Sequence, residues 1–407
     1  MTRLPTLLAS LAAFATLLLG CMDIPETFTD MNTVSITAVY PAGFEDDARS
    51  GVEVVVRNSD SGDTYTVLTD QGGTATLSLP DGLFIISISD RKGADIFNGT
   101  LDKVVVNCDS EIALPLEHSE GGTLVFKEIY CGGGSMAPKE GTYQMDKYVI
   151  IHNNSNEVCY LDSLCIGVAA PYNATANNPW ISRKADGTVV YRDFVPVAQA
   201  VWQIGGNGSS FPLEPGGDAV ICLLGAIDHT VGVPLSVNLN KPGYFVCYNQ
   251  TYFPNTSYHP APGDMIMKDH ILGVVIKTGI ANAYTVSISS PAMVIFRARE
   301  TSIQEFVSGS EHVIATPGSS NDYVTAIPYP WILDAVEVFD GRSTSNAKRL
   351  PPLLDAGFVF QSDIFKGHTL GRKVDEAASK AEGYEILMDT NNSTNDFQER
   401  HTQSLHE

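Results

Sequence analysis

The 407-residue sequence carries 25 basic and 47 acidic residues, which gives a formal net charge of −22 at pH 7. A surface this acidic repels phosphate backbones, so we expect no nucleic-acid partner and no docking onto anionic lipid by charge alone. Charged residues make up only 18% of the chain, while it contains 35 glycines and 22 prolines. This turn-rich composition favours an all-β fold over a helical bundle, and the length suggests two or three domains.

The N-terminus has the features of an export signal. Arg3 precedes an uncharged, mostly apolar run over residues 4–19, which ends in Leu-Leu-Gly-Cys at residues 18–21. A run this short predicts a signal peptide over residues 1–20 rather than a permanent membrane span. A small residue before cysteine resembles the bacterial lipobox, which implies lipid on Cys21. An ordinary signal peptide followed by an incidental cysteine is the alternative.

The lipobox resemblance also sets the expected location. A lipoprotein cysteine carries two or more acyl chains, which is what stable anchoring requires. Residues 21–32 then form a polar tether, in which Asp23 and Glu26 resemble the surface-export signals of Bacteroides-type lipoproteins. We therefore expect a lipid anchor in the outer membrane, with the protein on the cell surface. A position on the periplasmic face stays open.

Residues 33–118 read as a first β-sandwich, because short alternating apolar runs recur at 8–12-residue spacing. The phrases Thr-Asp-Gln-Gly-Gly at residues 69–73 and Leu-Pro-Asp-Gly at residues 79–82 resemble carboxypeptidase-regulatory-like, or transthyretin-like, domains. This resemblance implies an Ig-like sandwich that acts as a non-catalytic spacer. The expected strands span residues 34–39, 52–56, 64–69, 74–79, 83–89, 101–106 and 112–116.

A larger β-sandwich is expected over residues 122–407. Its strands at residues 124–129 and 148–151, followed by a Pro-Gly-Gly turn at residues 215–217, resemble the lamin-tail domain. The resemblance departs from the family pattern at His152 and at Ser163, where the family has tyrosine and glycine. Taken whole, the chain resembles an uncharacterised family of Bacteroides-type lipoproteins that joins these two domain types.

The lamin-tail-like resemblance implies long insertions, here at about residues 170–210 and 228–282. Loops on a rigid scaffold are where binding residues concentrate, so we expect specificity to come from these segments. Aromatic side chains in the two insertions are the candidate ligand-binding residues, because exposed rings stack on sugars or anchor partners. Local packing of the loops is the alternative. The candidates are Trp180, Trp202, Tyr252, Phe253 and Tyr258.

Other polar motifs favour structural roles. The segment at residues 389–397 offers alternating oxygen ligands, but Thr394 and Arg400 stand where a calcium-binding EF-hand needs glycine and glutamate, so we expect a turn that ends the domain with Phe397 in the core. We expect a flexible loop at residues 131–141 and a short helix beginning at the capping box of Ser302 and Glu305. Seven scattered histidines are expected to be solvated, namely His118, His152, His229, His259, His270, His312 and His368.

The six cysteines beyond Cys21 favour buried thiols, although a disulfide between Cys159 and Cys165 stays open. No metal-ligand spacing or catalytic motif is found, so we predict no cofactor, no metal and no enzymatic activity. The main hypothesis is a cell-surface binding lipoprotein that serves an outer-membrane uptake complex, with a TonB-dependent transporter as partner. A structural or adhesive surface protein and a hydrolase with its site in the insertions are the alternatives. The oligomeric state is not predicted.

Overall fold

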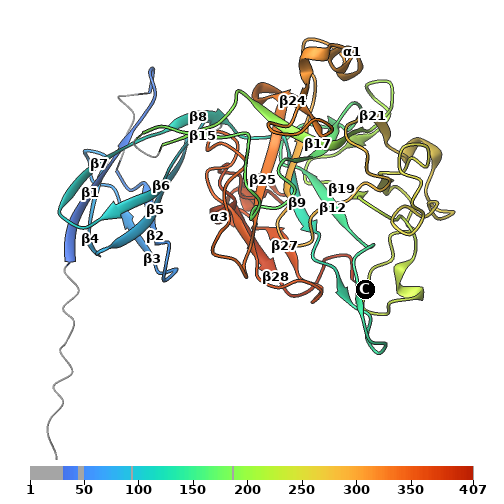
Figure 1. Cartoon of the computed structure of the whole chain (residues 1–407), viewed down its shortest axis with the longest axis horizontal. Coiled ribbons are helices and arrows are strands. Elements are labelled where there is room, and N and C mark those ends of the chain that lie inside the picture. The colour runs from blue at the N-terminus through green and yellow to red at the C-terminus, as the bar shows by residue number, and fades with distance from the viewer. Residues whose placement is uncertain (1–30, 45–49, 93–94, 186–187, 407) are drawn as a thin grey trace, which may run out of the picture.

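A computed structural model describes residues 31–44, 50–92, 95–185 and 188–406 of the chain. The predicted signal peptide, the lipidated Cys21 and most of the expected tether lie outside the described residues. The predicted all-β class is confirmed, because strands grouped into sheets make up nearly all of the regular structure (Figure 1). Within the described ranges, every helix is too short or too polar to cross a membrane.

The N-terminal part is a sandwich of a three-stranded sheet, in the order β4-β1-β7, and a five-stranded sheet, in the order β3-β2-β5-β6-β8. The alternation of apolar and polar residues along the strands explains this two-layer packing. In β1, for example, Val34, Ile36 and Ala38 point inward while their neighbours face outward. The expected strands are all present, although β6 begins earlier than expected and β8 was not foreseen. The bounds are β1 (Met31–Val39), β2 (Glu53–Asn58), β3 (Thr64–Leu68), β4 (Thr74–Pro80), β5 (Gly82–Lys92), β6 (Asp95–Val106), β7 (Ser110–Pro115) and β8 (Glu117–Glu120).

The larger part pairs a six-stranded sheet with an eight-stranded one. The first has the order β20-β19-β12-β9-β27-β28, and the second runs β23-β24-β17-β14-β22-β25-β26, with β21 paired to β17. The bounds in the first are β9 (Leu124–Tyr130), β12 (Tyr148–Asn153), β19 (Asp218–Cys222), β20 (Phe245–Val246), β27 (Thr369–Arg372) and β28 (Phe397–Arg400). Those in the second are β14 (Cys165–Ala169), β17 (Phe194–Gln203), β21 (Gly273–Lys277), β22 (Ala292–Phe296), β23 (Val313–Ala315), β24 (Tyr323–Pro328), β25 (Ile332–Asp340) and β26 (Val359–Gln361).

Short elements complete the larger sandwich. Helix α1 begins where the capping box predicts it, with the Ser302 hydroxyl accepting a hydrogen bond from the Glu305 N–H. Helix α1 spans Ile303–Ser308, and the other α-helices of the described residues are α2 (Glu376–Glu382) and α3 (Ser393–Asp396). Short 3₁₀-helices are η1 (His229–Val231), η2 (Lys268–His270), η3 (Ser310–His312) and η4 (Tyr329–Trp331). The two-stranded ribbons are β10 (Gly134–Ser135) with β11 (Thr142–Tyr143), β13 (Cys159–Tyr160) with β18 (Pro212–Leu213), and β15 (Ser182–Arg183) with β16 (Val189–Val190).

Both sheets of the larger sandwich are covered on their outer faces as well. Strands β12, β14 and β22 are buried at every position, which explains why they are apolar on both faces except for His152 and Asn153 at the end of β12. Segments from the second insertion cover the outer face of the six-stranded sheet, where Val237 and Leu239 share a buried cluster with Tyr148 and Ile150. Helix α1 and the residues after β25 cover the eight-stranded sheet, with Ile303 and Leu350 in that cluster. The insertions are therefore part of the packed structure.

The two sandwiches contact each other through the C-terminal segment (Figure 1). Asn98 of β6 donates to the carbonyls of Thr390 at 2.7 Å and Asn391 at 3.2 Å. At the junction, the Gly122 N–H donates to a carboxylate oxygen of Asp389 at 2.8 Å. A Cβ on Gly122 would lie 2.6 Å from the Leu333 carbonyl oxygen, so this close approach requires glycine.

The flexible loop predicted over residues 131–141 is not observed in the first part of this segment, which is packed and held by hydrogen bonds. Cys131 and the three glycines after it are buried. The carbonyls of Gly132 and Gly133 accept from the N–H groups of Phe365 and Gly367 at 2.8 and 2.9 Å. Gly133 has a φ of +70°, and a Cβ there would lie 2.3 Å from the Tyr143 carbonyl oxygen. The glycines therefore serve close backbone packing.

Four of the six cysteines in the described residues are buried thiols as expected, whereas Cys108 is exposed and Cys159 is half-buried. All six cysteines in the described residues are free, and Cys159 and Cys165 do not pair. Cys131, Cys165, Cys222 and Cys247 are buried, and burial raises the pKa of Cys131 and of Cys165 to about 12. Thiols with raised pKa values carry little nucleophilic thiolate, so these four act as small apolar side chains.

Candidate functional site

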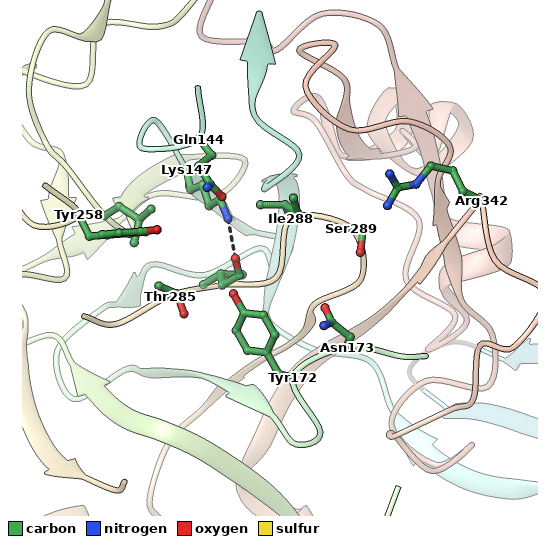
Figure 2. Close-up of a pocket in the computed structure, with 11 residues that line it drawn as sticks. Gln144, Lys147, Tyr172, Asn173, Tyr258, Thr285, Ile288, Ser289 and Arg342 are labelled. Atoms are coloured by element: carbon green, nitrogen blue, oxygen red, sulfur yellow. Dashed lines mark hydrogen bonds between the residues drawn. The ribbon is translucent and has the colours of Figure 1, made fainter. Parts of the chain in front are cut away.

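An open cavity of ≈ 500 Å³ lies at the end of the larger sandwich where the two insertions meet (Figure 2). Tyr172 and Asn173 come from the start of the first insertion, and Tyr258 comes from the second. The segment that follows the second insertion forms the floor, and Arg342 stands at the side after β25. The lining residues are Gln144, Lys147, Tyr172, Asn173, Leu224, Tyr258, Thr285, Val286, Ile288, Ser289 and Arg342.

Lys147 is the most unusual of these residues, because its side chain is 2% exposed. It directly precedes β12, where its carbonyl accepts from the Leu223 N–H and fixes the backbone. Its Nζ donates to the Val286 carbonyl at 2.5 Å, and Figure 2 shows this amine directed at the cavity. Burial lowers the pKa of Lys147 to about 8, against the opposing charges of Cys131 and Asp146. The amine is therefore mostly protonated at pH 7.

Arg342 gives the cavity a second cation. Its Nε and Nη2 donate to the two carboxylate oxygens of Asp340 at 2.9 and 2.8 Å, a bidentate pair. These bonds lower the pKa of Asp340 and raise that of Arg342, so both groups stay charged. The pair leaves Nη1 free of Asp340, and the half-exposed guanidinium remains accessible from solvent.

Neutral polar side chains and three aliphatic ones line the rest of the cavity, and hydrogen bonds from behind hold the polar part in place. Gln199 exchanges two hydrogen bonds with the backbone of Thr285, at 2.7 and 3.0 Å. Gln199 lies at a bulge in β17 and has a φ of +64°, which is a strained conformation for a residue with a side chain. The Ser287 hydroxyl donates to the Asn173 side-chain oxygen at 2.5 Å. The first insertion is thus tied directly to the segment that follows the second insertion, at the cavity wall.

The five aromatic residues predicted to bind a ligand fall into a buried group and an accessible group. Trp180, Trp202 and Phe253 are buried, so the prediction that they are exposed is wrong. Trp202 and Phe253 are buried and stack on each other with ring centroids 5.5 Å apart. Their contact packs the second insertion onto β17. Burying two large aromatic rings stabilises the fold more than leaving them in solvent would. Trp180 is buried against Phe194.

The other two candidates stay accessible. Tyr258 lines the cavity, while Tyr252 is 46% exposed and does not belong to the lining. Of the five aromatic residues predicted to bind a ligand, only Tyr258 lines the observed cavity. Local packing, the alternative interpretation, describes Trp180, Trp202 and Phe253, whereas Tyr252 is exposed outside the cavity.

Sequence analysis missed Lys147, Tyr172, Thr285, Ser289 and Arg342. One signal was available, since Lys147 is a lone lysine directly before the apolar run at residues 148–151. A cation at such a position is buried by its neighbours and needs a partner. Thr285 and Arg342 carry no comparable signal, because only the folded chain brings them beside Lys147.

The polar segment at residues 389–397 is structural, as predicted. Asn392 caps α3 and Phe397 is buried in the core. Arg372 contacts three buried carboxylates here, and its Nη2 bonds Asp334 Oδ2 at 2.5 Å while its Nη1 lies 3.3 and 3.4 Å from Asp389 and Asp396. Burial raises the pKa of Asp396 to about 7, although Arg372 opposes this shift. This cluster joins β25, β27 and the last turn into one buried network.

The prediction that the scattered histidines are solvated is wrong for four of them. His152, His229, His259 and His270 are buried rather than solvated. His152, for example, is held between the Asp218 carboxylate at 2.7 Å and the Glu385 carbonyl at 3.0 Å. Across the described ranges, histidines, cysteines and carboxylates form no group of three arranged to hold a metal ion.

The geometry defines an all-β protein of two sandwiches with a polar cavity at the loop end of the larger one. A family model described as "Protein of unknown function (DUF4876)" matches residues 214–404, which include Tyr258, residues 285–289 and Arg342. The chain is similar to a crystal structure of a DUF4876 family protein from Bacteroides thetaiotaomicron, with 26% identity, a TM-score of 0.57, and coverage of 90% of this chain and 94% of that one.

Other comparisons add little. A DUF3823 family protein from Parabacteroides merdae is similar over 44% of this chain and 83% of that one, at 13% identity and a TM-score of 0.18. Among curated proteins there is no match. The expected resemblance to an uncharacterised Bacteroides-type family is therefore confirmed for the DUF4876 family, while the pairing of the two specific domain types stays a prediction.

Proposed function

We propose that this chain is a non-enzymatic, ligand-binding lipoprotein of the outer membrane that serves an uptake complex. The cavity between the insertions carries the proposal. Its volume of ≈ 500 Å³ falls in the range that holds small molecules, roughly 300–1,000 Å³. Its walls come from elements that hydrogen bonds fix in place, so a ligand meets a site that is already formed.

The proposed location and partner rest on separate observations. The lipobox-like sequence at Cys21 supports a lipid anchor, and the second insertion supports a partner surface. This insertion exposes large apolar side chains, among them Ile280, which is 90% exposed. Exposed apolar side chains gathered in one segment are typical of protein contact sites. We propose a TonB-dependent transporter as the partner that receives the ligand.

The cavity part of the proposal is tested by ligand carry-over. The tagged lipoprotein is purified from its native membrane, and small molecules released on denaturation are identified by mass spectrometry. We expect an enriched small molecule with the wild type and with Tyr252→Ala, whose side chain is exposed in the same insertion but outside the cavity. We expect its loss with Tyr258→Ala, whose side chain lines the cavity. Equal recovery from both variants would contradict a site in this cavity.

The partner part is tested by cross-linking on intact cells after protease shaving has established surface exposure. We expect a transporter to co-purify with the wild type and to be lost with Ile280→Glu. The matched control is Leu68→Glu on the first sandwich, which places the same charge at another exposed apolar position. Recovery of the same transporter with Ile280→Glu would place the contact elsewhere, and the absence of any partner would remove the uptake role.

A further inference from the structure

We propose that the cavity selects small molecules that carry one carboxylate group beside several hydroxyl or amide groups, the chemistry of a sugar acid. This inference rests on the proposed binding function and names its ligand class. Lys147 holds the carboxylate at the floor of the cavity, and Arg342 draws the anion in from the side.

The sign of the charge is opposite to that of the molecule. The chain has a net charge of −22, yet the described residues that line this cavity include two cations and no carboxylate. Lys147 uses one hydrogen bond to a described protein acceptor, the Val286 carbonyl, although an ammonium group has three N–H donors. A buried ammonium with unused donors gains from an anionic acceptor, because a low-dielectric site strengthens charge-assisted hydrogen bonds.

The number of charges points to a monoanion. Each cation has a nearby carboxylate that is not part of the cavity lining. Asp340 pairs with Arg342, and Asp146 acts on the adjacent Lys147 through its charge while it accepts hydrogen bonds from the Ser236 hydroxyl at 2.5 Å and the Tyr130 hydroxyl at 3.3 Å. The positive field that faces the cavity is therefore partly compensated. One carboxylate suits it better than a phosphate, which carries nearly two charges at neutral pH.

The neutral groups describe the rest of the ligand. Two tyrosines, Tyr172 and Tyr258, stand on the walls, and an aromatic face packs well on the C–H face of a sugar ring. The side-chain amides of Gln144 and Asn173 and the hydroxyls of Thr285 and Ser289 offer both donors and acceptors, as a polyol requires, and three aliphatic side chains complete the lining. Figure 2 shows the Tyr172 hydroxyl and Thr285 on the same side as the Lys147 amine, with Asn173 and Ser289 nearer to Arg342.

Isothermal titration of the purified full-length lipoprotein tests this ligand class. The probes are glucuronate and galacturonate, their neutral parents glucose and galactose, and glucose 6-phosphate. We expect a uronate to bind at least about 10-fold more tightly than its parent sugar and than the phosphate, since one charge-assisted hydrogen bond contributes about that factor. Equal or tighter binding of the neutral sugar or the phosphate overturns the carboxylate inference and leaves the binding function standing.

Charge variants locate the contact. Lys147→Met is expected to weaken uronate binding about 10- to 100-fold, and Arg342→Gln about 3-fold because that guanidinium is half exposed. The controls Lys139→Met and Arg299→Gln remove exposed cations outside the cavity and should bind like the wild type. Thermal unfolding checks that the Lys147→Met variant folds. If it does not fold, the Arg342→Gln variant alone tests the inference. Unchanged uronate binding in Arg342→Gln and in folded Lys147→Met overturns the inference.

If neither uronate binds, the carboxylate inference falls as well. The ligand carry-over experiment then decides the proposed function by itself. A neutral molecule recovered from the wild type and lost with Tyr258→Ala would keep the binding function and replace the ligand class.

Discussion

The two sandwiches use polar residues in opposite ways. In the described part of the first sandwich, the buried polar side chains are uncharged, as with Asn58 and Asn98, and the core is apolar. The larger sandwich buries arginines, lysines and carboxylates, including Arg372, Arg349 and Lys147. Arg349, for example, forms a fully buried pair with Glu337 at 2.6 Å.

This difference follows from how each region holds its chain. Strand ladders and short turns satisfy the backbone of the first sandwich, so apolar packing suffices. The larger sandwich has long irregular segments with few ladder partners, and buried charged side chains supply donors and acceptors to them, as Arg349 does for the Ser290 carbonyl and Arg372 for the Met388 carbonyl. Arg372 and Arg349 are fully occupied in this way, whereas Lys147 faces a cavity with donors to spare. The contrast separates structural charges from the one that we assign to ligand binding.

The largest effect is expected from Arg372→Met. The change leaves Asp334, Asp389 and Asp396 without their shared cation, and removal of one partner from a buried ionic cluster costs about 3–5 kcal/mol. Urea unfolding monitored by tryptophan fluorescence measures it, since the chain's tryptophans lie in the larger sandwich. Arg299→Met, at an exposed position, is the control. A loss below about 1 kcal/mol would contradict a structural role for the cluster.

The second prediction concerns pH. Burial raises the pKa of Asp396 from 3.8 to about 7, so the folded protein binds this proton more tightly than the unfolded chain does. The resulting stabilisation is full below pH 3.8 and is lost as pH rises towards 7, by at most about 4 kcal/mol. In Asp396→Asn, the unfolding free energy should fall less steeply between pH 4 and 7 than in the wild type. Parallel profiles would show that Asp396 is already ionised at low pH.

The first sandwich was predictable strand by strand, whereas the site was not. In β1 the alternation of Val34, Ile36 and Ala38 with exposed residues encodes which face is buried. In the larger sandwich, β12 is apolar on both faces, so its sequence predicts a strand but not what covers it. The cavity combines segments that are far apart in the chain, and Trp202 was misassigned because an aromatic in a loop and one in a core look alike in sequence.

A pair of substitutions tests whether the second insertion buries the outer face of the six-stranded sheet, in contrast to the exposed edge of the first sandwich. Ile150 lies on the outer face of the six-stranded sheet, beneath the second insertion, and is 3% exposed, whereas Leu68 of β3 is 60% exposed. Ile150→Ser should destabilise the protein by about 3 kcal/mol, because it removes buried apolar volume and buries a hydroxyl. Leu68→Ser should change stability by less than about 0.5 kcal/mol. Similar losses in both variants, measured by urea unfolding, would contradict the coverage argument.

The smallest effect is expected where the two sandwiches meet. Asn98→Ala removes the donors to the Thr390 and Asn391 carbonyls, and a lost hydrogen bond of this kind costs about 1 kcal/mol. Asn107→Ala, at an exposed position of the same sandwich, should cost nothing measurable. Because Asn98 bridges two separately packed cores, its loss should also speed proteolysis near residues 120–122 while each core stays protected. Unchanged proteolysis with a lower unfolding free energy would mean that Asn98 stabilises only its own sandwich, and the C-terminal segment would then hold the junction through Asp389 and Gly122 instead.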